Sequence, residues 1–215
     1  QDHPLTGIFC AIKKDLFEIK STNGPTFYNS SLEINADNEL ELYLPKKSPQ
    51  MLKNIFTEHP LKKCSVNNRS VLFESNNCKL TLFIEQTGKD SFPNQIDDLL
   101  NKDSKAKIKI SVFELTKTLR FFNGIFPEAI VNFSLKDDIL TLESKESTIA
   151  AKEIIPTESC VGSAQSAYSS KMFIECLESL QSAWVEIDFI NMQDEFYLLK
   201  LHSGATLILL CPTTY

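Results

Sequence analysis

The sequence predicts an α+β fold that repeats one unit, a strand, a helix and three antiparallel strands, with the helices on one face of the antiparallel sheets. Apolar residues recur at helical spacing along residues 169–182, at Phe173, Ile174, Leu177 and Leu180. Three runs with strand-like alternation follow directly, at residues 184–190, 195–202 and 206–211. A helix of this kind begins near Ser48, Ser111 and Ser170, which lie 63 and 59 residues apart, so the unit recurs at a nearly constant period.

Local chemistry supports the three helix starts. Each serine is expected to be the N-cap, whose hydroxyl accepts a hydrogen bond from a backbone N–H of the first turn. Pro49 suits the first helical position because it has no N–H to satisfy, and Ser111 with Glu114 has the spacing of a capping box. A two-residue turn at Ser203 and Gly204 is expected between the last two strands.

The first half of the chain contains one complete unit. Strands are expected at residues 5–12, 16–20, 27–34 and 39–44, then a helix at 48–58, then strands at 61–66, 70–74 and 79–85. The helix should direct Met51, Leu52, Ile55 and Phe56 inward. Because the first three strands lack a leading strand and helix, we expect the chain to begin partway through a domain.

The second half contains two complete units. Its elements are expected at 107–110 (strand), 111–122 (helix), 129–135, 139–144, 148–155 and 165–168 (strands), and then as described above. The predicted domains are residues 1–90 and 106–215, joined by a polar linker at 91–105 that holds at most a short helix at 96–100.

Composition places the chain among globular proteins. It has 215 residues, of which 42% are hydrophobic and 23% charged, and no apolar run near the roughly 20 residues of a membrane span. The net charge of −6 argues against a protein that coats nucleic acid with its whole surface, but it permits a local basic face. Six cysteines without metal-site spacing are interpreted as reduced core thiols of a cytoplasmic protein, and Trp184 as a core residue.

Catalytic motifs are missing from the sequence. His3, His59 and His202 lie far apart, and there is no phosphate-binding glycine loop, nucleophile motif or zinc motif. The adjacent carboxylate pairs Asp97-Asp98 and Asp137-Asp138 lie in linker or turn contexts and are interpreted as solvated turns rather than metal sites. We therefore expect neither enzymatic activity nor a cofactor.

Several short stretches, in order along the chain, carry a resemblance to a known family. They are Leu5-Thr6-Gly7-Ile8, Thr22-Asn23-Gly24, Leu44-Pro45-Lys46-Lys47, Phe92-Pro93-Asn94, the helix at 169–180, and Leu209-Leu210-Cys211-Pro212. With them the chain resembles the bacterial sliding clamp, the β subunit of DNA polymerase III. The resemblance implies the DNA-clamp fold and the middle and C-terminal clamp domains, without the first domain and the opening strand and helix of the middle one.

The resemblance implies a processivity factor of DNA replication. Such a clamp encircles duplex DNA, which it binds weakly and without reading sequence. It tethers the replicative DNA polymerase subunit, has a clamp loader as a further partner, and forms a homo-oligomeric ring when the full-length chain is present. It is a non-catalytic, cytoplasmic protein that does not bind membranes. The DNA-facing residues implied here are Lys46, Lys47, Lys53, Lys117, Arg120 and Lys171.

A peptide-binding cleft is the second feature that the resemblance implies. Its residues are Leu5, Thr22, Gly24, Phe27, Pro93, Leu209, Leu210, Cys211, Pro212 and Thr213. The chain departs from the family at Asn23-Gly24-Pro25-Thr26 and lacks the usual basic residue near its end. Because the charges of the three helices also balance, a clamp-like interaction module that does not encircle DNA stays open as the second hypothesis. An enzyme of an unrecognised type is the third.

Overall fold

The structure, a computed structural model, describes residues 7–35, 39–67, 69–84, 95–126, 128–146, 148–193 and 196–213. These residues form four helices and sixteen strands, and the chain divides into two compact units. Unit 1 contains Gln1–Gly24 and Asn29–Asn94, and unit 2 contains Pro25–Tyr28 and Gln95–Tyr215. All strand pairs whose register is defined are antiparallel, which confirms the predicted α+β class. The domain bounds drawn from the sequence stay a prediction.

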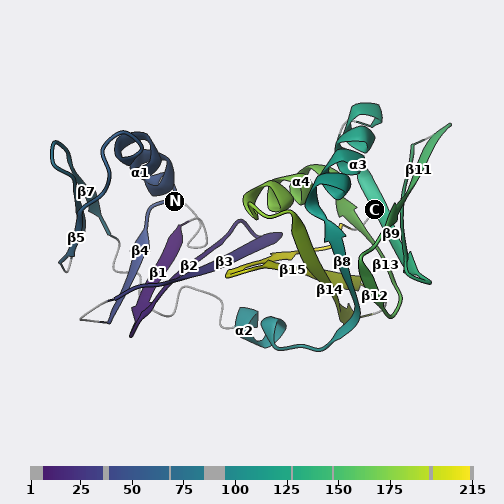
Figure 1. Ribbon diagram of the computed structural model, residues 1–215, viewed down its shortest axis with the longest axis horizontal. Helices are drawn as coiled ribbons and strands as arrows, with labels where there is room; N and C mark the ends of the chain where they lie inside the picture. Colours follow the sequence, from purple (N-terminus) through teal and green to yellow (C-terminus); the bar gives the residue numbers. More distant parts are fainter. Residues whose placement is uncertain are drawn as a thin grey trace. The chain divides into compact units, whose positions relative to one another are not determined.

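Unit 1 consists of two sheets and one helix. Its elements are β1 (Ile8–Lys13), β2 (Leu16–Thr22), β3 (Thr26–Glu33, of which residues 26–28 belong to unit 2), β4 (Leu40–Leu44), α1 (Ser48–Phe56), β5 (Lys63–Val66), β6 (Ser70–Glu74) and β7 (Lys79–Phe83). β1 pairs with β2 on one side and β4 on the other, while β5, β6 and β7 form a separate three-stranded sheet. Leu52 and Phe56 of α1 pack on a core that includes Val71 and Phe73, so α1 joins the two sheets (Figure 1).

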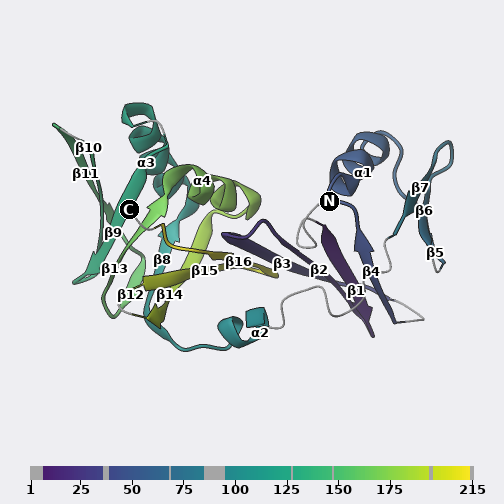
Figure 2. The same ribbon diagram turned by 180° about the vertical axis from the view of Figure 1, so that it is seen from behind.

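Unit 2 has the larger core. Its elements are α2 (Gln95–Leu100), β8 (Ser104–Ser111), α3 (Val112–Ile125), β9 (Ile130–Lys136), β10 (Ile139–Glu146), β11 (Ile149–Pro156), β12 (Ser159–Val161), β13 (Ala164–Ser169), α4 (Ser170–Ser179), β14 (Trp184–Gln193), β15 (Phe196–Ser203) and β16 (Thr206–Leu210). The sheets run in the orders β12-β8-β14-β15-β16 and β11-β10-β9-β13. α3 and α4 lie side by side (Figures 1 and 2), as expected for helices on a common face.

Aromatic residues fill the centre of unit 2. The Phe133 and Phe173 rings stack with centroids 5.1 Å apart, and the buried Tyr168 hydroxyl donates to the Tyr197 carbonyl at 2.8 Å. Burial of such rings is the main source of stability in a core of this kind. None of the helices in the described part of the chain is long and apolar enough to cross a membrane.

Only one of the three predicted N-caps is confirmed. The Ser111 hydroxyl accepts from the Glu114 N–H at 3.4 Å. The cap of α4 is Ser169, one residue before the predicted Ser170, and the cap position of α1 is Lys47, so those two predictions are wrong. Ser170 and Ser48 are instead the first residues of their helices, and both are buried.

The predicted helix faces need two corrections. Met51, expected inside, is 41% exposed. Thr116, which helical spacing predicts on the outer face of the helix at 111–122 together with Lys117 and Arg120, is buried. α3 also continues three residues past its predicted end at Phe122, while α1 and α4 end at Phe56 and Ser179, before their predicted ends. Helix ends fray and depend on tertiary contacts, so such shifts are ordinary.

The turns follow residue chemistry. Asp137 and Asp138 both have positive φ, 52° and 63°, in the β9–β10 turn, so their interpretation as a turn is confirmed. Asp97 and Asp98 lie in α2, so the same interpretation is wrong for them. Ser203 pairs with Thr206, which makes Gly204 and Ala205 the turn, one residue later than predicted. Gly204, with φ 57°, occupies a turn position that favours glycine. The short β12 was not predicted, and β8 begins at Ser104, inside the predicted linker.

Two predictions about single residue types are also wrong. Trp184 is 44% exposed, and the Lys109 ammonium lies 5.8 Å from its ring centroid. All six cysteines are free, but only Cys10 and Cys176 are buried, and Cys64 and Cys211 are exposed. Burial raises the pKa of both Cys10 and Cys176 to about 12.

Candidate nucleic-acid interface

Three of the basic residues implied by the resemblance lie on the outer faces of α3 and α4. Lys117 and Arg120 are exposed on α3, and Lys171 is exposed in the first turn of α4. The opposite face of α3 is fully buried at Leu115 and Leu119. This segregation follows from the helical period and leaves the basic groups free to meet a polyanion.

Acidic partners offset part of this charge. The Arg120 guanidinium lies 2.6 Å from the Glu178 carboxylate of α4, and the Lys117 ammonium lies 4.0 Å from Glu114. All four side chains are largely exposed, and pairs of this kind contribute only about 0.2–1 kcal/mol. A phosphate group can therefore compete with the carboxylates for Lys117 and Arg120.

Exposed aromatic residues accompany the basic ones on α3. Phe113 and Phe121, which are 69% and 48% exposed, stand four residues to either side of Lys117. Residues at this spacing share one helix face. The sequence reasoning missed this stripe because it recorded only the charged residues of the outer face, although the spacing of four residues was visible.

Unit 1 supplies the remaining three basic residues. Lys46 precedes α1, Lys47 is its N-cap residue, and Lys53 lies in its last turn. All three side chains are exposed. The short strands and turns around α1 therefore place these cations at the surface of unit 1.

The predicted cleft residues of unit 2 meet at the end of β16. The Cys211 N–H donates to the Pro25 carbonyl at 2.8 Å, and the Thr213 N–H donates to the Ala167 carbonyl at 2.8 Å. These bonds bring residues 25–28, which include Phe27, next to the end of the chain. Phe27, Leu209 and Leu210 are buried, whereas Cys211 is exposed and Pro212 and Thr213 are partly exposed.

The other predicted cleft residues belong to unit 1 or lie outside the described residues. Thr22 and Gly24 belong to unit 1, where the Gly24 N–H donates to Thr22 Oγ1 at 3.2 Å. Gly24 has φ 98°, a backbone conformation that favours glycine. Leu5 and Pro93 lie outside the described residues.

A polar cluster on β8, β14 and β15 was also missed. Asp188 is buried, with its carboxylate 3.7 Å from the Lys107 ammonium and 3.7 Å from His202 Nε2. The Glu186 carboxylate lies 3.8 Å from His202 Nδ1. The alternating pattern of residues 184–190 predicts that the carboxylates of Glu186 and Asp188 face solvent. The cluster becomes visible only from the strand register, which pairs Asp188 with Lys107 and Lys200.

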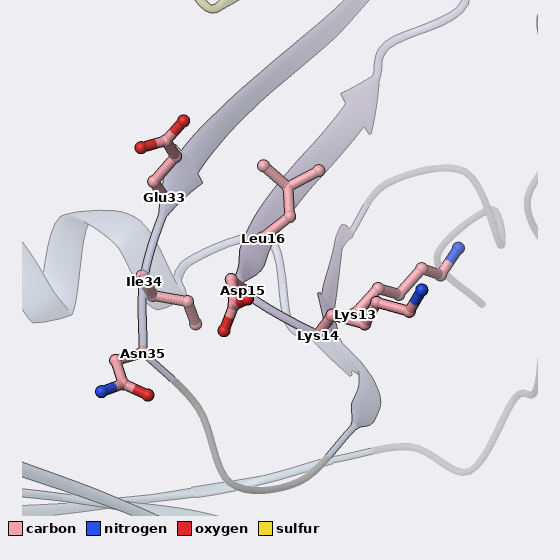
Figure 3. Close-up of a pocket in the computed structure, with 7 residues that line it drawn as sticks. All are labelled: Lys13, Lys14, Asp15, Leu16, Glu33, Ile34 and Asn35. Atoms are coloured by element: carbon pink, nitrogen blue, oxygen red, sulfur yellow. The ribbon is translucent and has the colours of Figure 1, made fainter.

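An open hollow of about 580 Å³ lies in unit 1 between the β1–β2 turn and the end of β3 (Figure 3). Leu16 and Ile34 supply apolar surface, Asp15 and Glu33 carboxylates, and the Lys13 and Lys14 side chains extend away together. The lining contains no serine, cysteine or histidine that could act as a nucleophile or base. Within the described ranges, no three His, Cys, Asp or Glu residues gather as a metal site.

The repeated strand–helix–three-strand units, with antiparallel sheets and paired helices, define the DNA-clamp fold. Solved structures that share it with this chain include β subunits of bacterial DNA polymerase III. The β chain from Streptococcus pneumoniae has a TM-score of 0.88 at 17% identity, covering 100% of this chain and 58% of that one. The sliding clamp from Bacillus subtilis has a TM-score of 0.87 at 16% identity, with coverage of 100% and 58%.

The β subunit from Thermotoga maritima has a TM-score of 0.86 at 17% identity, covering 99% of this chain and 58% of that one. The chain thus spans less than three fifths of the length of these structures. No protein-family model and no curated protein sequence matches it significantly. The sliding-clamp fold implied by the sequence resemblance is confirmed.

Proposed function

We propose that the protein is a sliding clamp, a non-catalytic accessory subunit that encircles duplex DNA and tethers the replicative polymerase. The observation that carries the proposal is the fold, shared with sliding clamps over the whole chain at TM-scores of 0.86–0.88. The copies form a homo-oligomeric ring that a clamp loader opens, in the cytoplasm, where bacterial chromosomes are replicated.

DNA is held through its phosphates. Lys117, Arg120 and Lys171 on the outer faces of α3 and α4, with Lys46, Lys47 and Lys53 from unit 1, supply charges that carry no sequence information. Such contacts weaken steeply as salt rises. Because Glu114 and Glu178 compete for the same cations, each contact is weak, which suits a protein that slides.

Partners dock at the end of β16. Cys211, Pro212 and Thr213 are accessible there, and Leu5, Thr22, Gly24, Phe27 and Pro93 are assigned to the same peptide site on the resemblance alone. Leu209 and Leu210, which directly precede this segment, are buried and hold its start in place. Docking one or two apolar side chains gives micromolar affinity, because ordering the peptide offsets much of the burial.

Titration of a fluorescent peptide from the polymerase subunit of the same cell tests this site. Deletion of residues 211–215 should abolish binding, as should Gly24→Trp, while Glu143→Gln, an exposed change on β10, should leave the affinity unchanged. Far-ultraviolet circular dichroism of each variant checks that the chain stays folded. Equal affinities for all the variants would place the docking site elsewhere.

A clamp-like interaction module that does not encircle DNA is the second candidate. The pairing of Arg120 with Glu178 and the net charge of −6 favour it. This candidate predicts that the peptide binds as above while the protein dissociates equally fast from circular and linear DNA. A clamp predicts a large difference between the two.

A further inference from the structure

Two exposed aromatic rings on α3 have no part in the packing of the core. Phe113 is 69% exposed and Phe121 is 48% exposed. The core of unit 2 receives its apolar side chains from the opposite side of α3, where Leu115 and Leu119 are fully buried. Single apolar residues at a surface are ordinary, but two rings on one helix face are typical of a binding surface.

A cation lies between the two rings. Phe113, Lys117 and Phe121 follow each other at a spacing of four residues, so they form one row along the surface of α3. The two phenylalanines are eight residues apart, which is about 12 Å along the helix axis. Ile125, which is 38% exposed, ends the row four residues further on. This row is the aromatic face of α3.

The Phe121 ring is fixed without being covered. Its centroid lies 5.7 Å from that of the buried Phe122 ring, and the two planes meet at 69°, which is an edge-to-face arrangement. Because this contact already restricts the ring, little conformational freedom is lost when a flat group packs on its exposed part.

The charges beside the rings suit an anionic partner. The Lys117 ammonium lies 4.0 Å from the Glu114 carboxylate, and both side chains are more than half exposed. The carboxylate of Glu178 is paired with Arg120 instead. Exposed pairs of this kind are weak, so a phosphate can displace Glu114 from Lys117. An anion with flat apolar groups on both sides of its charge therefore fits the aromatic face.

Unpaired DNA bases match this face better than a duplex does. Aromatic side chains bind the faces of unpaired bases while cations between them hold the phosphates. In a duplex the neighbouring base pairs cover those faces, and a side chain can enter only if a base step is unstacked. A face with one weakly paired cation cannot offset that cost. An apolar protein surface would have to cover the Lys117 ammonium, which is also unfavourable.

We propose that the aromatic face of α3 binds single-stranded DNA, with unpaired bases stacked on Phe113 and Phe121 and the intervening phosphate on Lys117. The inference rests on the proposed function, which brings DNA to α3 and α4, and it adds a preference for DNA that contains unpaired bases. Binding is independent of sequence, because every base has a face on which a ring can stack.

Fluorescence anisotropy with a labelled oligo(dT) and a blunt duplex of the same length measures this preference at one salt concentration. The variant Phe113→Leu/Phe121→Leu keeps two apolar side chains but removes the rings. Single-strand binding should weaken about tenfold, while duplex binding stays nearly unchanged. The matched control Phe83→Leu/Phe196→Leu removes two exposed rings from β7 and β15 and should alter neither dissociation constant.

Photo-cross-linking of the unaltered protein gives a second readout. An oligonucleotide with iododeoxyuridine in place of thymidine cross-links under ultraviolet light to aromatic side chains that stack on the base. Peptide mass spectrometry should locate the adducts at Phe113 and Phe121. Adducts confined to other peptides would overturn the inference. It would also be overturned if the Phe113→Leu/Phe121→Leu variant bound single strands as tightly as the parent, in which case this face serves a protein contact instead.

Retention on circular DNA separates this inference from the proposed function, because a closed ring is held without aromatic contacts. A protein that is retained on circular DNA but gives no adducts on α3 would keep the clamp function and overturn the inference. Adducts on α3 from a protein that leaves circular and linear DNA equally fast would support the inference and contradict encirclement.

Discussion

At the scale of residues, two features stand out: the basic residues of α3 are paired with carboxylates, and the cysteine thiols differ widely in burial. Arg120 and Lys117 have carboxylate partners on the same solvent-facing surface, so their charge is available but not unopposed. Cys10 and Cys176 lie in the cores of the two units, whereas Cys64 and Cys211 face solvent. Both features make predictions that single substitutions can test.

Glu178→Gln should strengthen binding to duplex DNA. The substitution removes the carboxylate that lies 2.6 Å from Arg120, so the guanidinium meets phosphate without competition. We expect about two- to fivefold tighter binding at low salt and a steeper salt dependence. Fluorescence anisotropy with a labelled duplex measures the change. Glu143→Gln on β10 alters the net charge equally and serves as the control. If both variants bound duplex DNA more tightly by the same factor, the change would be due to net charge and not to the Arg120–Glu178 pair.

The buried thiols should make the protein less stable in alkali. The pKa of Cys10 and Cys176 is 9.0 in the unfolded chain and about 12 in the folded one, chiefly because burial disfavours the thiolate. Between these values the unfolded chain loses protons that the folded chain keeps, so the free energy of unfolding falls as pH rises above 9. Urea unfolding at pH 8, 9.5 and 10.5 should show a smaller decline in the variant Cys10→Ala/Cys176→Ala. Parallel declines would contradict this assignment.

At the scale of elements, stability depends on how the helices begin and which strands cover them. Ser111→Ala should lower the free energy of unfolding by about 1 kcal/mol, because it removes the acceptor for the Glu114 N–H. Chemical denaturation measures the loss. Ser163→Ala, in the turn before β13, is the matched control and should change stability by less than half as much. A Ser111→Ala variant as stable as the parent would show that the cap contributes nothing.

The repeat of elements could be predicted from sequence because it rests on periodicity. Apolar spacing located α1, α3 and α4, and alternation located the long strands, whereas α2 was expected only as a short helix at most. The prediction of the α4 cap was wrong because two adjacent serines, Ser169 and Ser170, fit the position equally well in the sequence. Tertiary packing buries Ser170 against Asn123, so Ser169 is the cap. Met51 fits an inward pattern as well as Phe173 does, but burial depends on which other elements pack against the helix, which periodicity within α1 cannot reveal.

The candidate sites were less predictable than the fold. Exposure of Lys117, Arg120 and Lys171 follows from the helical period, but the Arg120–Glu178 contact joins residues 58 apart in sequence. The Asp188 cluster likewise depends on the register of β8, β14 and β15. Neither register nor helix packing is encoded in local spacing, so the network of charges could not be derived from the sequence.

At the scale of the whole molecule, the fold is that of sliding clamps, and the proposed function depends on topology rather than on the affinity of single contacts. A closed ring stays on circular DNA because this DNA has no end from which the ring could slide off, even when each phosphate contact is weak. This account therefore predicts slow loss from circular DNA and rapid loss from linear DNA at the same salt concentration.

The most direct measurement is retention on nicked circular DNA before and after the circle is cut once. The protein expressed from its natural start codon is loaded by the clamp loader of the same cell, and the bound fraction is followed by gel filtration. We predict a bound half-life of many minutes on the circle and at least a tenfold faster loss after linearisation. The same half-life on both forms would contradict encirclement and with it the proposed clamp function.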